Sequence, residues 1–359
     1  MKRSILYIII FSFLFISCEK SSNPNVLIFM TDDQGWGDLS INGNTNLKTP
    51  NIDSFSKNGA SFSKFYVSPV CAPTRAELLT GKYFVRTGVN GVTRGYERMN
   101  TNEKIISNYF KERNYSTGLF GKWHNGSQPP YHPNSRGFDE FYGFTSGHWG
   151  NYFDPILERN GELVRGKGYI NDDVTNNAIS FIRNSVKPFF TFISYNTPHS
   201  PMQVPDKYSK EKKVILKGRY SERENIEKTK AALGMIENID KNVGNIIKYL
   251  KEIGKYDDTI IIFLSDNGPN GNRWNNEFKE RKGSTNEGGV RVPFFIQWPK
   301  KIKPGIKIKQ VTSVLDVFPS LIDLIENSTN MIFDGKSFKK YIENPDLFDN
   351  QRKVFSFWI

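Results

Sequence analysis

Cysteine and histidine are scarce in this sequence. Its 359 residues include two cysteines, Cys18 and Cys71, and four histidines. No combination of them has the spacing of a zinc finger, which excludes a structural zinc site of that kind. The sequence also lacks an arginine-rich arm and an aromatic RNA-binding signature. No nucleic acid partner is therefore expected.

The sequence has no apolar stretch long enough to span a membrane comfortably. The stretch from Ile5 to Ile16 is shorter than the roughly 20 residues that a spanning helix needs. It follows the basic residues Lys2 and Arg3 and ends next to the small residue Ser17. This pattern predicts an export signal over residues 1–17.

The residues around Cys18 suggest how the exported chain is held. The sequence Phe-Ile-Ser-Cys over residues 15–18 resembles a bacterial lipobox, in which the cysteine is lipidated and the preceding residues are removed. We therefore expect a lipoprotein anchored to the membrane, in the periplasm or at the cell surface, with residues 18–24 as a polar tether. An ordinary cleaved signal with an incidental cysteine is the alternative.

Acidic residues are fewer than basic residues, and the formal net charge is +12. A basic surface of this kind can attract a polyanion. The alternative is a lysine-rich surface that is simply solvated. The lysine clusters are Lys210, Lys212 and Lys213, and Lys300, Lys301 and Lys303.

If Cys18 is lipidated, Cys71 has no cysteine with which to form a disulfide. Free cysteines are commonly buried as small apolar side chains. In an exported protein, however, a single cysteine also suggests a reactive group.

Apolar runs alternate with segments of helical periodicity, which predicts an α/β fold with a mostly parallel central sheet flanked by helices. Most predicted strands are apolar on both faces, as a buried parallel sheet requires. The predicted strands are Asn25 to Met30, Ser116 to Phe120, Pro188 to Tyr195, Asp258 to Leu264 and Val292 to Trp298. The predicted helices are Glu103 to Glu112, Asn176 to Asn184, Ile226 to Ile253 and Val314 to Ile325.

Four of these strands run directly into clusters of polar residues. Ligands of open α/β sheets bind at the carboxyl ends of strands, so the four clusters are expected to meet in one crevice. Each cluster alone is also compatible with a turn, because Asp, Asn and Gly favour turns. The clusters are Thr31-Asp32-Asp33, Gly121-Lys122-Trp123-His124, Asn196-Thr197-Pro198-His199 and Ser265-Asp266-Asn267-Gly268.

Two of the clusters supply only oxygen ligands. Asp32, Asp33, Asp266 and Asn267 suit a hard cation, Ca²⁺ or Mg²⁺. The adjacent carboxylates would repel each other in a buried crevice, and a cation would relieve that repulsion.

The most specific motif begins at Cys71. The sequence CAPTRAELLTG, residues 71–81, fits the Cys-x-Pro-x-Arg signature with its Leu-Thr-Gly ending. Here the chain resembles the type I sulfatases of the alkaline phosphatase superfamily. The resemblance extends through TDDQGWGD at 31–38, GKWH at 121–124, TPHSP at 197–201, SDNG at 265–268 and KGSTNEGGVRVP at 282–293.

This resemblance implies a formylglycine (3-oxoalanine) made from Cys71 by a formylglycine-generating or radical maturase enzyme. One hydroxyl of its hydrate would attack sulfur, and the other would allow release of sulfate. The resemblance also places residue 71 at the metal beside Asp32, Asp33, Asp266 and Asn267. The further roles that it implies are Asp266 favouring the alkoxide, Arg75 holding the hydrate, His124 as the base, Lys122 and Lys282 on the sulfuryl oxygens, and His199, with Lys282, protonating the leaving oxygen.

An aromatic segment, residues 131–155, is the predicted substrate-binding region. Aromatic faces and planar cations suit sugar rings and anionic groups, so Arg136, His148 and Trp149 are the candidate contacts. The alternative is a loop packed over the site. We expect the substrate to be a sulfated glycan, with galactose or N-acetylgalactosamine as the sulfated unit.

The resemblance implies a catalytic domain over residues 25–330. Residues 331–359 are expected to begin a C-terminal antiparallel subdomain that is largely missing, and the end of the chain is interpreted as the start of a strand. Two rival functions remain: hydrolysis of phosphate mono- or diesters by the same superfamily, and a non-catalytic glycan-binding lipoprotein.

Overall fold

The computed structural model describes residues 23–326 and 330–357. The predicted export signal and the predicted lipidation site, Cys18, lie outside the described residues. Within that part of the chain, no helix has both the length and the apolar character needed to cross a membrane.

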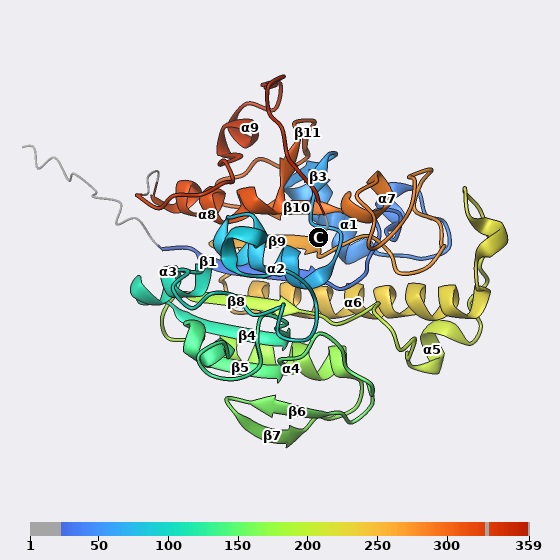
Figure 1. Ribbon diagram of the computed structural model, residues 1–359, viewed down its shortest axis with the longest axis horizontal. Coiled ribbons are helices and arrows are strands. Elements are labelled where there is room, and N and C mark those ends of the chain that lie inside the picture. The colour runs from blue at the N-terminus through green and yellow to red at the C-terminus, as the bar shows by residue number, and fades with distance from the viewer. Residues whose placement is uncertain (1–22, 327–329, 358–359) are drawn as a thin grey trace, which may run out of the picture.

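A large sheet forms the centre of the described chain, with strand order β11-β2-β10-β9-β1-β8-β4-β5-β6-β7 (Figure 1). The five central strands, β9, β1, β8, β4 and β5, are parallel, which confirms the predicted α/β class. The strands are β1 (Asn25–Thr31), β2 (Ala60–Phe62), β4 (Ser116–Lys122), β5 (Glu140–Phe144), β6 (Ile156–Arg159), β7 (Glu162–Arg165), β8 (Phe189–Ser194), β9 (Thr259–Ser265), β10 (Phe294–Gln297) and β11 (Ile306–Ile308). A small second sheet pairs β3 (Phe65–Tyr66) with β12 (Thr312–Ser313).

Helices cover both faces of this sheet, and the reason is visible in β1. Successive side chains of a strand point to opposite faces. Val26, Ile28 and Met30 join one hydrophobic core with α2, α3 and α8, whereas Leu27 and Phe29 join a second core with α1, α4 and α6. The helices are α1 (Pro50–Asn58), α2 (Cys71–Thr80), α3 (Ile106–Glu112), α4 (Ile170–Asn184), α5 (Asp206–Ser209), α6 (Ile226–Glu252), α7 (Glu287–Val290), α8 (Val317–Glu326) and α9 (Lys339–Glu343).

The predicted elements are present, with shifted boundaries. The predicted helix from Glu103 begins at Ile106, and the one predicted from Asn176 already begins at Ile170. The predicted strand Val292 to Trp298 shortens to β10, which runs antiparallel to β9 and β2.

The segment after residue 330 packs against the same core as the strands. Phe338, Tyr341 and Ile342 belong to the core that contains α2 and α8. Ser356 donates its hydroxyl to the Val67 carbonyl, and the Phe357 ring lies 5.0 Å from the Phe84 ring. The prediction that the chain ends as a strand is wrong as far as residue 357, because these side-chain contacts hold it as an irregular segment.

Candidate active site

Cys71 is the first residue of α2, directly after the extended backbone of Val70. Pro73 fits in the first turn because the missing N–H has no partner there in any helix. Gly81 ends the helix in the left-handed conformation (φ 67°), and its N–H bonds to the Glu77 carbonyl. Every residue of α2 is buried, so the motif places Cys71 at a fixed point inside the protein.

The sheet register brings the predicted acidic ligands together. Strands β1 and β9 are parallel neighbours, and Thr31 lies opposite Ser265 at their carboxyl ends. The residues that follow, Asp32 and Asp266, have carboxylate oxygens that lie within 4.8 Å of each other and of Cys71 Sγ. Asp32, Asp33 and His199 form a second group within the same limit.

Three oxygen atoms of the predicted metal ligands are buried and lack a hydrogen-bond partner. They are Asp32 Oδ1, Asp33 Oδ2 and Asn267 Oδ1. Buried polar atoms are normally satisfied, and this set of hard oxygen donors matches Ca²⁺ or Mg²⁺. The residues present therefore fit a divalent cation.

Two lysines approach the carboxylates from other elements. Lys122, the last residue of β4, places Nζ 2.6 Å from Asp32 Oδ2, and Lys282 Nζ lies 2.5 Å from Asp33 Oδ1. Burial acts to raise the pKa of Asp32, but the charge of Lys122 and the neighbouring cations outweigh it and hold that pKa below its usual range. Burial and the nearby Asp32 charge raise the pKa of Asp266 to about 6.

Arg75 lies one turn after Cys71 and ties α2 to two strand ends. Its Nη2 lies 2.8 Å from Asp266 Oδ2, and Nη1 donates to Ser194 Oγ at 2.5 Å and to the Lys122 carbonyl at 3.1 Å. The guanidinium therefore fixes the orientation of Asp266 relative to residue 71.

The Cys71 thiol is poorly suited to act as a nucleophile without modification. Its side chain is buried, and burial raises the pKa of the thiol. The reactive form of cysteine is the thiolate, so this environment disfavours direct attack by sulfur.

The two predicted catalytic histidines differ in their hydrogen bonding. His124 Nε2 lies 2.8 Å from the Val92 carbonyl, and its buried Nδ1 has no partner. Burial lowers the pKa of His124 well below its usual value, which favours a neutral ring that can accept a proton. His199 Nδ1 lies 2.7 Å from the Ser200 carbonyl, and Nε2 lies 3.7 Å from Asp33 Oδ2.

A cavity of about 450 Å³ opens over these groups, and we call it the active-site crevice. Cys71, His124, His199 and Lys282 line it, together with His148, whose ring lies 5.1 Å from the His199 ring. His148 is thus the predicted substrate contact that lies beside the predicted catalytic residues.

The other two predicted substrate contacts lie elsewhere. Arg136 is buried and donates to the carbonyls of Met99 and Glu103, at 3.2 and 2.9 Å. Its assignment as a substrate contact is corrected, because its guanidinium satisfies the backbone. Trp149 stacks on Phe144 with ring centroids 5.0 Å apart and is not among the residues lining the crevice.

Sequence reasoning missed several residues of the site. Arg94 and Glu97 line the crevice, and they come from a loop without a recognised motif. Asp38 and Arg273 form a buried ion pair with 2.8 Å between Nη2 and Oδ2. The position of Asp38 inside the TDDQGWGD motif was the available signal for that pair.

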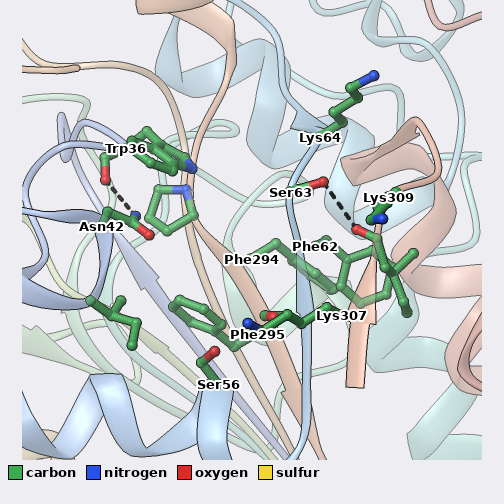
Figure 2. Close-up of a pocket in the computed structure, with 14 residues that line it drawn as sticks. Trp36, Asn42, Ser56, Phe62, Ser63, Lys64, Phe294, Phe295, Lys307 and Lys309 are labelled. Carbon is green, nitrogen blue, oxygen red and sulfur yellow. Dashed lines mark hydrogen bonds between the residues drawn. The ribbon is translucent and has the colours of Figure 1, made fainter. Parts of the chain in front are cut away.

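A larger cavity, of about 560 Å³, lies along β2, β10 and β11 (Figure 2). Its walls include Phe62, Phe294 and Phe295, and Lys64, Lys307 and Lys309 lie around it. None of the predicted catalytic or metal-binding residues lines it. The active-site crevice is therefore the smaller of these two cavities.

Comparisons with known proteins agree with this geometry. N-acetylgalactosamine-6-sulfatase of Mus musculus is 29% identical over 352 residues, covering 87% of this chain and 65% of the mouse protein. The enzyme of the same name from Sus scrofa is 30% identical and covers 87% of this chain and 64% of its own length. The chain thus spans just under two thirds of the length of these curated relatives.

Solved structures show the same fold. The crystal structure of Ps i-CgsB in complex with k-i-k-neocarrahexaose has a TM-score of 0.80 and 34% identity, covering 90% of this chain and 76% of that one. PsFucS1 sulfatase from Pseudoalteromonas sp. has a TM-score of 0.72 and 27% identity, covering 87% of this chain and 70% of that one. A family model described as Sulfatase matches residues 24–327. The chain therefore belongs to the sulfatase family.

Proposed function

We propose that this protein hydrolyses sulfate esters of a sulfated glycan, with a formylglycine made from Cys71 and a bound divalent cation. The observation that carries the proposal is the position of Cys71 at the start of α2, with Sγ within 4.8 Å of carboxylate oxygens of Asp32 and Asp266. The buried thiol, with its raised pKa, is a poor nucleophile. Oxidation would replace it with an aldehyde whose hydrate can take part in the reaction.

Asp32, Asp33, Asp266 and Asn267 would hold the cation, because three of their oxygens are buried and unpartnered. A bound cation would lower the pKa of a hydroxyl on the hydrated residue 71 and so favour its action as a nucleophile.

Cationic side chains around residue 71 are placed to bind the sulfuryl group. Lys122 and Lys282 each pair with a carboxylate of the cluster. Their ammonium groups can instead donate hydrogen bonds to the negatively charged sulfuryl oxygens, where charge increases as the ester bond breaks. Arg75 holds the Asp266 carboxylate in place through its hydrogen bond from Nη2.

Each of the two histidines has one role in proton transfer, His124 as acceptor and His199 as donor. Neutral His124, with its unpartnered Nδ1, accepts a proton from the hydroxyl at residue 71. His199 in its cationic form can donate a proton from Nε2 to the leaving alcohol oxygen, while Nδ1 remains bonded to the Ser200 carbonyl. General acid–base catalysis of this kind requires groups within hydrogen-bond reach of the reacting atoms.

Relatives of two kinds support a glycan substrate. Two curated relatives are named N-acetylgalactosamine-6-sulfatase, and one solved relative contains a neocarrahexaose. We therefore favour a sulfated galactose or N-acetylgalactosamine unit for this chain.

Mass spectrometry combined with an activity assay tests the proposal. Protein produced together with a maturase enzyme should carry the aldehyde at residue 71 and release sulfate from a sulfated galactoside when Ca²⁺ or Mg²⁺ is present. The Cys71→Ala variant should fold but release none. Faster hydrolysis of the matched phosphate ester would favour the phosphate-ester rival, and active protein with unmodified Cys71 would contradict the mechanism.

Export and anchoring form a separate proposal based on residues 1–24. Labelled fatty acid should be incorporated into the full chain and should be lost in the Cys18→Ala variant. Release of the wild-type protein into the soluble fraction without lipid would contradict the anchor.

A further inference from the structure

A third cavity, of about 370 Å³, lies next to the active-site crevice. Three separate segments form its walls, and they contribute Ser200, Arg223, Lys228, Asn272, Arg273 and Arg281. We call it the Arg223 cavity. Its volume falls within the range of small-molecule sites in proteins.

The two cavities share a wall. His199 lines the active-site crevice, and the next residue, Ser200, lines the Arg223 cavity. In the same way Lys282 lines the crevice, and the preceding residue, Arg281, lines the Arg223 cavity. Consecutive Cα atoms are about 3.8 Å apart. A ligand held at Lys282 and His199 therefore ends close to the Arg223 cavity.

The charges of the Arg223 cavity are mainly positive. Arg223 and Lys228 are exposed, and neither side chain has an ion-pair partner among residues 23–326 and 330–357. Arg281 donates to the side-chain oxygen of Asn272, which orients its guanidinium without neutralising it. Arg273, in contrast, is neutralised by Asp38.

One carboxyl group lies among these cations. Glu224 lines the cavity, and its Oε2 is buried without a hydrogen-bond partner. Burial raises the pKa of Glu224. The cavity also contains the start of α6, where Asn225 accepts from the Lys228 N–H, and a helix N-terminus favours anions.

We infer that the Arg223 cavity is a second anion subsite, in which Arg223, Lys228 and Arg281 bind a sulfate or carboxylate on the sugar next to the one being desulfated. This inference rests on the proposed function and extends it to the neighbouring sugar. It assigns to the enzyme a preference for glycans that carry negative charge on two adjacent sugars. The alternative is a set of solvated basic side chains with no ligand.

Binding to an inactive protein tests the subsite without turnover. Three disaccharides serve as probes, each sulfated on the terminal sugar, with a hydroxyl, a sulfate or a carboxylate on its neighbour. In the Cys71→Ala background with Ca²⁺, calorimetry should show about 10-fold tighter binding of at least one doubly charged probe, the size expected for a charge-assisted hydrogen bond. Higher salt should weaken this preference.

Replacing the two unpaired cations should remove the preference. The Arg223→Ala/Lys228→Ala double variant should bind all three disaccharides with the affinity of the singly charged one. As a matched control, the Lys241→Ala/Lys303→Ala variant removes two exposed lysines that lie in neither cavity. It should retain the preference. The single variant Arg223→Lys keeps a positive charge and leaves Lys228 in place, so it should retain part of the preference for doubly charged probes.

The outcomes separate this inference from the proposed function. A double variant that keeps the full preference overturns the subsite, and so does a parent protein that binds all three probes equally. If the matured enzyme releases sulfate from none of the probes, the proposed function fails, while the binding preference remains measurable. In matured enzyme the double variant should raise KM for the preferred probe about 10-fold and leave kcat unchanged.

Discussion

Arg273 donates a hydrogen bond from Nη2 to the backbone carbonyl of Asp33, with 2.6 Å between the two atoms. Asp33 has a positive φ of 67°, a conformation that is uncommon for residues other than glycine. The same guanidinium contacts both carboxylate oxygens of Asp38. The buried Asp38–Arg273 pair therefore positions the backbone of a candidate metal ligand.

Replacing Arg273 with lysine should weaken cation binding. Lysine keeps the positive charge, but a single ammonium cannot reproduce the planar set of donors that reaches Asp38 and the Asp33 carbonyl together. We expect Ca²⁺ affinity to fall about 10- to 100-fold, the usual effect of losing a group that orients a metal ligand. Calorimetric titration of Ca²⁺ measures the change.

A second arginine provides the control for that variant. Arg291 pairs with Glu287 and donates to the Ser63 carbonyl, so Arg291→Lys should leave the affinity for Ca²⁺ unchanged. Equal Ca²⁺ affinity in wild-type protein and Arg273→Lys would show that the contact with Asp33 has no role in metal binding.

Removing the cation should destabilise the fold. Asp32, Asp33 and Asp266 are buried close together, and like charges in such a site repel. A free Ca²⁺ concentration 100 times the Kd should stabilise the protein by about 2.7 kcal/mol. Thermal unfolding with Ca²⁺ and with chelator measures the difference.

The stabilisation by Ca²⁺ should depend on the carboxylates of Asp32, Asp33 and Asp266 and not on other acidic residues. Asp266→Asn removes one candidate ligand charge and should abolish most of the stabilisation. Asp346→Asn changes an exposed residue outside the site and should retain all of it. If Asp266→Asn responds to Ca²⁺ like wild type, the cation binds somewhere else.

The convergence of the acidic residues could be predicted because two of the strands are recognisable from the sequence. β1 and β9 are apolar on both faces, and each is followed by Asp residues. Parallel buried strands end at the same edge of a sheet. The sequence did not indicate that β1 and β9 are immediate neighbours, with Thr31 opposite Ser265; tertiary packing decides this.

Other features depend on contacts that no local pattern reveals. The interpretation of Arg136 as a substrate contact was wrong because its side chain is buried and donates to the carbonyls of Met99 and Glu103. β10 is antiparallel to β9, since residues 266–293 contain only the short α7 and no long crossover helix that would return the chain to the opposite edge. Neither the partners of a buried arginine nor the direction of a strand follows from composition.

The loop that carries His199 should depend on Tyr152. The Tyr152 hydroxyl lies 2.9 Å from the His199 carbonyl and 3.1 Å from the Ser200 carbonyl. Tyr152→Phe should lower the free energy of unfolding by about 1 kcal/mol and reduce kcat more than it changes KM, because His199 loses its position. Steady-state kinetics across pH, together with urea unfolding, separates the two effects.

Tyr169→Phe is the matched control for the Tyr152 variant. The Tyr169 hydroxyl also bonds a backbone carbonyl, that of Gln203, at 2.9 Å. This variant should show a similar loss of stability with unchanged kcat. If both variants lose kcat equally, the contact of Tyr152 with His199 has no special role in catalysis.

The last prediction concerns Glu77, which is buried in α2 within the motif that begins at Cys71. It accepts hydrogen bonds from Ser68 Oγ and the Phe84 N–H, but burial raises the pKa of its carboxyl to about 8. The folded protein therefore holds a proton at Glu77 that the unfolded chain has already released. The stabilising contribution of this proton is complete below about pH 4.5 and is lost as the pH rises to about 8.

Glu77→Gln removes this titration while keeping the shape of the side chain. The variant should match wild type near pH 5 and be more stable near pH 9, by about 2 to 4 kcal/mol, since each unit of pKa shift corresponds to about 1.4 kcal/mol. Urea unfolding at several pH values measures the difference. Glu343→Gln, which changes an exposed carboxyl, should follow the wild-type curve. Parallel curves for Glu77→Gln and wild type would mean that Glu77 is ionised in the folded protein, with α2 carrying a buried charge beside the site.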